Sequence, residues 1–385
     1  MKWFFFFAIL IASFVSHAQP IIYGRTTGQL PYLEYGLGDD RLGGAKMGYL
    51  DTGVLMQVID SFNTDYKVQL SAQHVAYLPK RNFVNDTAYK PLPLMLSSSF
   101  RVWGDDRYDY VSIALPERLP YKSVQQINPS RIVVDIYGAT TNTNWITQLK
   151  TAEEVTNVWY EQPEDDVLRV FIELAHGQHW GYFIYYNKNA LQVRVKRQPQ
   201  KLRIKDLVIA VDAGHGGPGS TGARGATSGI LEKDYTLKMA KQLQHKLEQK
   251  GATVYMTRTD DTDVTMIDRT LALRQLDPHL MISIHLNSSG NATAKGTSTY
   301  YRYIGFRPLS QTILDRMLDL GLNNFGNIGA FNFSLSGPTE YPNCLVEVAF
   351  LSNVDDEKRI LDEAFHEDVA DQIYKGIKDW LDNMK

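Results

Sequence analysis

Cysteine is nearly absent from this chain: Cys344 is the single cysteine among 385 residues. One cysteine cannot form an intrachain disulfide, so cysteine content does not indicate whether the protein is in a reducing or an oxidising compartment of the cell. An excess of charge is also missing, because 40 Lys and Arg stand against 43 Asp and Glu, a net charge of -3. Nothing in this balance suggests a polyanion-binding protein, so we expect no nucleic-acid partner. Beyond residue 18 no apolar run reaches the ~20 residues that a membrane span needs.

The first 18 residues have the pattern of a cleaved signal peptide. Lys2 is followed by an apolar run over residues 3–15 and by Ser16-His17-Ala18, which resembles a cleavage site. A membrane anchor is the alternative, but the run is short for a span. No cysteine lies nearby to carry a lipid. We therefore expect export, with the mature chain periplasmic or secreted.

Residues 21–85 are predicted to form a small all-β module. The stretches 53–62 and 65–78 carry β-branched and aromatic residues, and Gly- and Asp-rich turns separate the strands. A small barrel fits this length. The region weakly resembles a bacterial SH3-like wall-binding domain, with an undefined β module as the alternative.

Residues 92–197 are predicted to form a second all-β module. Apolar and polar residues alternate along 108–115, 130–138, 166–174 and 190–197. This period of two indicates half-buried antiparallel strands, and hence a β-sandwich.

Two motifs of this second module resemble the AMIN domain, which precedes many cell-wall amidases. They are Leu119-Pro120-Tyr121 and RIVVDIYG over 131–138. The resemblance implies peptidoglycan binding or targeting to the wall, and a sandwich without a ligand is the alternative. Trp145, Trp159 and Trp180 would suit sugar stacking if exposed, but we expect each in the core.

A basic, Pro-containing linker over 196–201 leads into alternating strands and helices over 206–385. That alternation predicts an α/β fold, a mostly parallel sheet with flanking helices. Residues 208–211 form an apolar run typical of a central strand covered on both faces. Gly214 and Gly216 let the chain turn sharply after it. His215 is thus expected at the carboxyl end of a core strand, where α/β sheets place ligands.

A second apolar strand, 280–285, also ends in a histidine, His285. Glu232 opens the helix after His215, which sends its carboxylate towards the same end of the sheet. Two histidines and a glutamate are the ligand set of a catalytic zinc with an open position for water. Spacing alone does not settle this, because no HExxH helix is present and a lone histidine is usually structural.

Glu347 stands inside the apolar stretch 344–350. Burying a carboxylate there as an unpaired ion costs several kcal/mol. One interpretation is an edge-strand glutamate facing water. The other is a carboxylate with a raised pKa that handles a proton beside the metal.

Four ordered segments resemble the zinc-dependent N-acetylmuramoyl-L-alanine amidase family, the type 3 amidase fold. They are VDAGHGG with His215, GILEKDYTLKMA with Glu232, MISIHLNSS with His285 and CLVEVAFLSN with Glu347. The resemblance covers nearly all of residues 208–385. It implies that the first three residues bind Zn²⁺ and that Glu347 is the general acid/base acting on zinc-bound water.

The activity implied by this resemblance is cleavage of the amide between the lactyl group of N-acetylmuramic acid and L-alanine of the stem peptide. Its implied role is cell-wall remodelling or daughter-cell separation. Two alternatives stay open: a zinc murein peptidase, and a catalytically inactive wall-binding activator. We expect a monomer whose partner is peptidoglycan, with an activator protein as a further candidate.

Two more residues are candidates for supporting roles. Asp212 is a candidate for orienting a histidine ligand, or is a turn residue. Arg224 is a candidate contact for a peptide carboxylate, although a solvated loop residue is the more common outcome. The family pattern is broken at Leu273-Arg274 and at Ser298, which are not among the four chemical positions.

Overall fold

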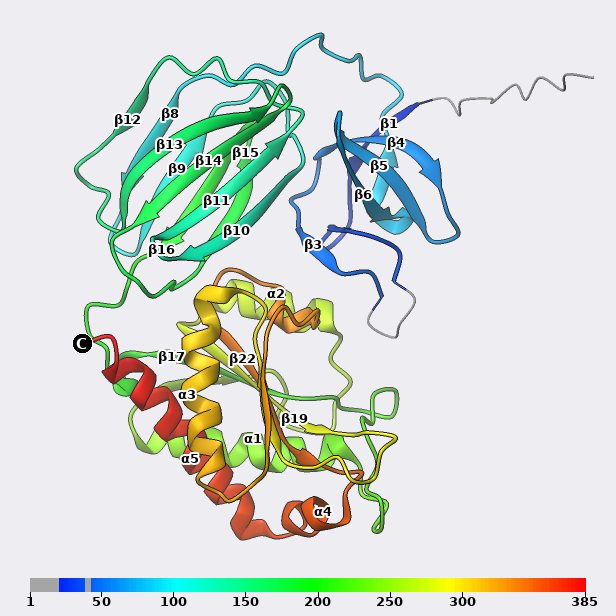
Figure 1. Ribbon diagram of the computed structural model, residues 1–385, viewed down its shortest axis with the longest axis vertical. Helices are drawn as coiled ribbons and strands as arrows, with labels where there is room; N and C mark the ends of the chain where they lie inside the picture. Colours follow the sequence, from blue (N-terminus) through cyan, green and yellow to red (C-terminus); the bar gives the residue numbers. More distant parts are fainter. Residues whose placement is uncertain (1–20, 39–42) are drawn as a thin grey trace, which may run out of the picture.

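The computed structural model describes residues 21–38 and 43–385. The predicted signal peptide lies outside the described residues. Two all-β parts lie above a helix-and-sheet domain in Figure 1, and α2 (Met266–Leu276) lies at the end of that domain that faces them. Across the described ranges, no helix combines the length and the apolar character needed to cross a membrane.

The first part is a sheet of seven short strands in the order β3-β2-β6-β5-β4-β1-β7, and its strand pairs are antiparallel. Buried side chains alternate with less buried polar ones, as Val68 and Leu70 of β5 do on either side of Gln69, which explains the polar residues between the apolar ones in the sequence. The SH3-like identity of this sheet stays a prediction. The strands are β1 (Ile22–Thr26), β2 (Tyr32–Glu34), β3 (Lys46–Tyr49), β4 (Leu55–Ser61), β5 (Asp65–Ser71), β6 (His74–Pro79) and β7 (Phe83–Asn85), with the 3₁₀ turn η1 (Lys80–Asn82) before β7.

The second part is the predicted β-sandwich, with sheets ordered β10-β11-β14-β13 and β12-β8-β9-β16-β15. Alternate residues such as Val111 and Ile132 are fully buried between the sheets, as the period of two predicts. The strands are β8 (Phe100–Gly104), β9 (Tyr108–Ile113), β10 (Tyr121–Ile127), β11 (Ser130–Tyr137), β12 (Ile146–Gln148), β13 (Val155–Glu164), β14 (Val167–Leu174), β15 (Tyr182–Asn187) and β16 (Ala190–Lys196).

The three tryptophans of the sandwich have different environments. Trp180 is 2% exposed and packs against Trp380 of the α/β domain, so its core prediction is confirmed. Trp159 is half-buried and stacks on Phe171. Trp145 is 60% exposed, so the core prediction is wrong there. It directly precedes β12, which is the edge strand of its sheet.

The third part is a six-stranded sheet in the order β18-β17-β19-β22-β20-β21. Neighbours pair in parallel except β20 and β22, so the predicted α/β class is confirmed. The central strands β17 and β19 are buried along almost their whole length, which explains their continuous apolar sequences. The strands are β17 (Val208–Ala213), β18 (Thr253–Met256), β19 (Leu280–Asn287), β20 (Thr297–Tyr300), β21 (Asn324–Ile328) and β22 (Asn343–Phe350).

Helices α1, α3 and α5 pack together against this sheet, while α2 and the 3₁₀ turn η4 contact each other through a separate apolar cluster that contains Leu273 and Leu335. Strand β21 and helix α4 were not predicted, because one is short and contains glycine and the other is a short, strongly charged helix. The helices are α1 (Glu232–Gln249), α3 (Arg307–Leu318), α4 (Val354–Ile360) and α5 (Glu363–Asp382), with the 3₁₀ turns η2 (Ile204–Asp206), η3 (Ile304–Phe306) and η4 (Ser334–Ser336).

Candidate metal centre

The chain turns sharply where β17 ends, and this turn presents His215. The residue has a φ of 64°, a left-handed conformation that non-glycine residues rarely adopt. Gly214 lies directly against the other imidazole, because a Cβ there would lie 2.5 Å from Cε1 of His285. The two strand-end histidines therefore approach each other closely, with ring centroids 5.0 Å apart.

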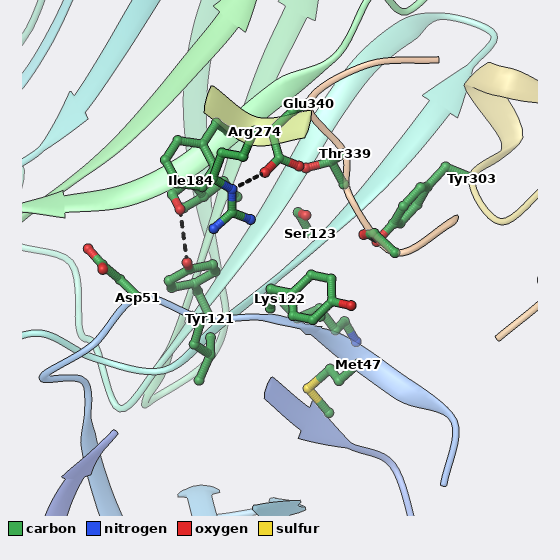
Figure 2. A pocket seen from close by; sticks show the side chains of 15 residues that line it. Met47, Asp51, Tyr121, Lys122, Ser123, Ile184, Arg274, Tyr303, Thr339 and Glu340 are labelled. Atoms are coloured by element: carbon green, nitrogen blue, oxygen red, sulfur yellow. Dashed lines mark hydrogen bonds and ion pairs between the residues drawn. The ribbon is translucent and has the colours of Figure 1, made fainter. Parts of the chain in front are cut away.

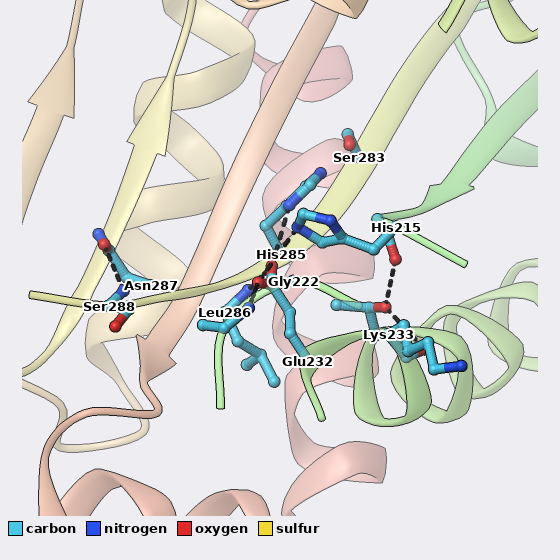
Figure 3. Close-up of polar contacts among 12 residues, drawn as sticks. His215, Gly222, Glu232, Lys233, Ser283, His285, Leu286, Asn287 and Ser288 are labelled. Atoms are coloured by element: carbon cyan, nitrogen blue, oxygen red, sulfur yellow. Dashed lines mark hydrogen bonds and ion pairs between the residues drawn. The ribbon is translucent and has the colours of Figure 1, made fainter. Parts of the chain in front are cut away.

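Glu232 joins the two histidines, as Figure 3 shows. Its Oε2 lies 3.1 Å from Nε2 of His215, and its Oε1 lies 3.1 Å from Nδ1 of His285. The backbone N–H groups of Ala223 and Leu286 also donate to this carboxylate, at 2.7 and 3.0 Å. The glutamate is the first residue of α1 and is 4% exposed, so the fold holds it in one position.

The donor atoms of His215, Glu232 and His285 all lie within 4.8 Å of one another. Burial by itself would raise the pKa of Glu232, but hydrogen bonds with the two histidines lower it, so the carboxylate is ionised at neutral pH. Burial by itself would lower the pKa of His285, but the bond with Glu232 raises it. Two imidazoles and an ionised carboxylate at this spacing fit a divalent metal of the zinc type.

The three residues open into a cavity of about 770 Å³, and Glu347 lines the same cavity. Glu347 is half-buried on β22 and is the register partner of His285 on β19. The edge-strand interpretation is wrong, because β19 and β20 flank β22 on both sides. A raised pKa and a proton-handling role for Glu347 stay predictions. Ser298, where the sequence departs from the family pattern, is the register partner of Glu347 on β20.

The contacts of Asp212 do not lead to either imidazole ring. Its carboxylate accepts hydrogen bonds from Arg269, Thr257 and Ser283. Arg269 in turn donates to the backbone oxygen of His215, so this group supports the turn after β17. The predicted orienting role is therefore replaced by a structural one.

Two supporting residues escaped the sequence analysis. Ser220 lies with its Oγ 3.1 Å from Nδ1 of His215, which leaves Nε2 for a metal. Glu357 of α4 is fully buried and accepts hydrogen bonds from the backbone and hydroxyl groups of Thr227 and Ser228. A serine five residues after a histidine, and a glutamate inside a short charged helix, carry no sequence pattern that marks such roles.

Arg224 does not belong to this cavity. Its side chain is exposed, and it donates to the backbone oxygen of Gly229 in its own loop. Arg224 is not one of the described residues that line the cavity. The position of Arg224 therefore does not support the predicted contact with a peptide carboxylate.

Residues 209–379 match the family model described as N-acetylmuramoyl-L-alanine amidase, and residues 99–205 match the AMIN domain. The probable cell wall amidase LytH of Staphylococcus aureus is 33% identical over 207 residues, which cover 54% of this chain and 69% of LytH. The catalytic domain of CwlV, an N-acetylmuramoyl-L-alanine amidase from Bacillus (Paenibacillus) polymyxa var. colistinus, is 34% identical and aligns with a TM-score of 0.44 over 46% of this chain and 99% of that domain. An N-acetylmuramoyl-L-alanine amidase from Clostridium difficile 630 is 32% identical, with a TM-score of 0.44 over 46% of this chain and 98% of its own.

Proposed function

Because this chain belongs to the N-acetylmuramoyl-L-alanine amidase family, we propose that it cuts peptidoglycan with a zinc ion held by His215, Glu232 and His285. The bond cut is the amide between the lactyl group of N-acetylmuramic acid and L-alanine of the stem peptide. The observation that carries the proposal is a metal-type donor cluster that opens into the cavity shared with Glu347.

When bound, zinc supplies a Lewis acid that lowers the pKa of water towards about 7 and polarises a carbonyl. The protein's own residues hold the site for this chemistry. Two backbone N–H groups fix the carboxylate of Glu232, and Ser220 fixes the ring of His215. Since these supports are in place before substrate arrives, little reorganisation is needed during the reaction.

Glu347 is the proposed proton carrier. It lies beside His285 in the sheet and faces the cavity in which the substrate amide binds. Its carboxylate takes a proton from the attacking water, and the same group then protonates the amine of L-alanine as the C–N bond breaks. The products are a lactyl carboxylate and a peptide with a free amino terminus.

The test compares the full chain with its Glu347→Gln variant on purified sacculi. We expect the amide-cleavage rate to fall about 10²–10⁴-fold, because a positioned acid/base contributes that much, while zinc content stays unchanged. Glu367→Gln, an exposed glutamate on α5, is the matched control and should keep the wild-type rate. Full activity in Glu347→Gln would disprove the proton-carrier role.

Product analysis by mass spectrometry separates the alternatives. Free lactyl carboxylates on the glycan identify the amidase. New termini within the stem peptide identify a murein peptidase. A wild-type protein that binds sacculi and zinc but releases no product identifies an inactive wall-binding protein.

The AMIN and amidase domains together indicate an extracytoplasmic protein. We further propose that export through a cleaved signal peptide brings it to the periplasm or outside the cell, where it acts in wall remodelling or daughter-cell separation. Peptide sequencing of the exported protein tests the cleavage after Ala18. Cells lacking the protein should form chains if separation is its role.

A further inference from the structure

One wall of the metal-site cavity is formed by two phenylalanines, Phe331 and Phe333. They belong to the segment 329–342 between β21 and β22. The ring of Phe333 meets the ring of His285 edge-on, with centroids 5.4 Å apart. Phe331 packs against Tyr300 at 4.6 Å and against Phe333 at 6.3 Å. We call Phe331 and Phe333 the aromatic wall; any shift in it changes the shape of the cavity beside a metal ligand.

The α/β domain alone gives this wall little backbone support. Ala330, just before it, has a φ of 56°, in the left-handed region. The N–H of Phe331 donates to the backbone oxygen of Tyr301 at 3.2 Å. The wall lies in an irregular stretch and not in a sheet ladder, so its position depends on side-chain contacts.

Several of the contacts that hold this segment come from the first β part, some 285 positions earlier in the chain. Asn332 stands between the two phenylalanines and donates from Nδ2 to the backbone oxygen of Gly44 at 2.8 Å. Its Oδ1 accepts from the N–H of Lys46 at 3.2 Å and from Nη1 of Arg302 at 3.3 Å. Arg302 also donates to the backbone oxygen of Lys46. Asn332 and Arg302 thus connect the wall to the start of β3.

Tyr49, at the other end of β3, supplies a second connection. Its hydroxyl donates to the backbone oxygen of Ser334 at 3.2 Å. Its ring lies against Gly337, where a Cβ would come within 2.8 Å of the ring. The strand β3 therefore runs along the segment that carries the wall and contacts it on both sides of Phe333.

The same segment continues into a junction of all three parts, shown in Figure 2. Thr339 exchanges two hydrogen bonds with the backbone of Tyr182 in the sandwich, at 2.7 and 2.8 Å. Glu340 is 4% exposed and accepts from Nε of Arg274 at 2.6 Å. These contacts anchor the far end of the segment, so only the stretch near the wall depends on β3.

We propose that the first β part positions the aromatic wall of the amidase site through Asn332 and Arg302, and so sets substrate binding inside the cavity. This inference rests on the proposed amidase function. This role differs from attachment of the protein to peptidoglycan. It predicts an effect even on substrates that are too short to engage a separate binding module.

The experiment measures kcat and KM of the full chain on a soluble muropeptide of one N-acetylmuramic acid and its stem peptide. Asn332→Ala removes three hydrogen bonds, and we expect KM to rise about five- to tenfold with kcat changed less than about twofold. Asn324→Ala, an exposed asparagine on β21, is the matched control and should behave as the wild type. Asn332→Asp keeps the acceptor and loses the donor, so it should give an intermediate KM.

Backbone hydrogen exchange supplies a readout that is independent of turnover. In Asn332→Ala, exchange should quicken over residues 328–337 and stay unchanged in β19. Tyr49→Phe changes only the β-module side of the contact and should give a smaller effect in the same direction, which covers the case in which Asn332→Ala folds poorly.

Two results would overturn the proposal. One is an unchanged KM on the short muropeptide for both variants, with any loss confined to intact sacculi. The other is unchanged exchange over residues 328–337. A wild-type protein that cuts neither substrate would instead overturn the amidase function, so the two failures are distinguishable.

Discussion

Two carboxylates are buried near the carboxyl end of the same sheet, and their surroundings are opposite. Asp212 is fully buried, and each of its partners is a donor: Nη1 of Arg269 at 2.7 Å, and the hydroxyls of Thr257 and Ser283, both at 2.6 Å. Because a guanidinium is always protonated, this group is neutralised permanently. Asp212 is not among the described residues that line the metal-site cavity.

Glu232 is 4% exposed and lies between two imidazoles at the edge of a cavity. A neutral imidazole offers a lone pair to a metal, which a guanidinium cannot do. The comparison teaches that burial of a carboxylate does not mark a reactive site by itself. The chemistry of its partners and its access to a cavity decide whether the group stabilises the fold or binds a metal.

The largest expected effect is on the structural carboxylate. Asp212→Asn leaves the buried guanidinium of Arg269 without its counter-charge, so the free energy of unfolding should fall by about 3–5 kcal/mol. Urea denaturation followed by circular dichroism measures it. Asp368→Asn, an exposed aspartate on α5, is the control and should stay within about 0.5 kcal/mol of the wild type. A loss below about 1 kcal/mol in Asp212→Asn would remove the contrast between the two carboxylates.

Glu232→Gln should have the opposite result to Asp212→Asn, with a large loss of activity and a smaller loss of stability. Loss of the anionic ligand should abolish zinc binding and reduce amide cleavage about a thousandfold, equivalent to about 4 kcal/mol of barrier. The metal-free variant should unfold with a loss of only about 1–2 kcal/mol relative to the metal-free wild type, because glutamine keeps one of the two acceptors for the N–H groups of Ala223 and Leu286 and loses the other. Metal analysis and denaturation after chelation check both halves. Retained zinc would show that the two histidines suffice.

Glu357 extends the comparison to a third buried carboxylate, one with neutral donors only. Burial by itself would raise its pKa, but bonds from Ser228 and Thr227 lower it. Glu357→Ala leaves four donors without their acceptor, so stability should fall by about 2 kcal/mol and loop 225–228 should become accessible to protease. Amidase activity should fall less than in Glu232→Gln. A loop that stays protected would contradict the anchoring role.

The smallest effect concerns pH. Burial by itself would raise the pKa of Asp212, but Arg269 and the hydroxyl donors lower it. A lowered folded-state pKa means that the stabilisation is present above the unfolded value of about 4 and is lost as pH falls through the folded value. Ser283→Ala should lower the free energy of unfolding by about 1 kcal/mol at pH 7. The loss of stability on acidification should then begin at a higher pH than in the wild type. Denaturation midpoints between pH 2 and 7 measure this shift. The same dependence on pH in Ser283→Ala and in the wild type would contradict it.

Much of the site could be predicted from local sequence. Two apolar strands that end in histidine, and a glutamate that opens the next helix, place three side chains at one end of a parallel sheet. The sandwich was predictable for a similar reason, since alternation follows from burial on one face. Strand β21 and helix α4 were not, because short polar elements are stabilised by tertiary contacts and carry little periodicity.

The wrong or untested predictions have a common cause. The core prediction for Trp145 failed because residue type does not say whether a position lies at the edge of a sheet. Asp212 was a candidate either for orienting a histidine or for a turn, whereas its carboxylate binds an arginine 57 positions away. Contacts over such distances leave no mark on the local pattern.

The sequence by itself determined the α/β class and the sandwich and placed three candidate donor residues at one end of the sheet, because periodicity and strand ends are local properties of the chain. The tertiary structure alone decided that Asp212 is closed off by a guanidinium while Glu232 opens to a cavity. It also decided that β3 contacts the aromatic wall through Asn332. The physical reason is that hydrogen bonds and burial depend on which distant segments meet, and a linear pattern does not specify those meetings.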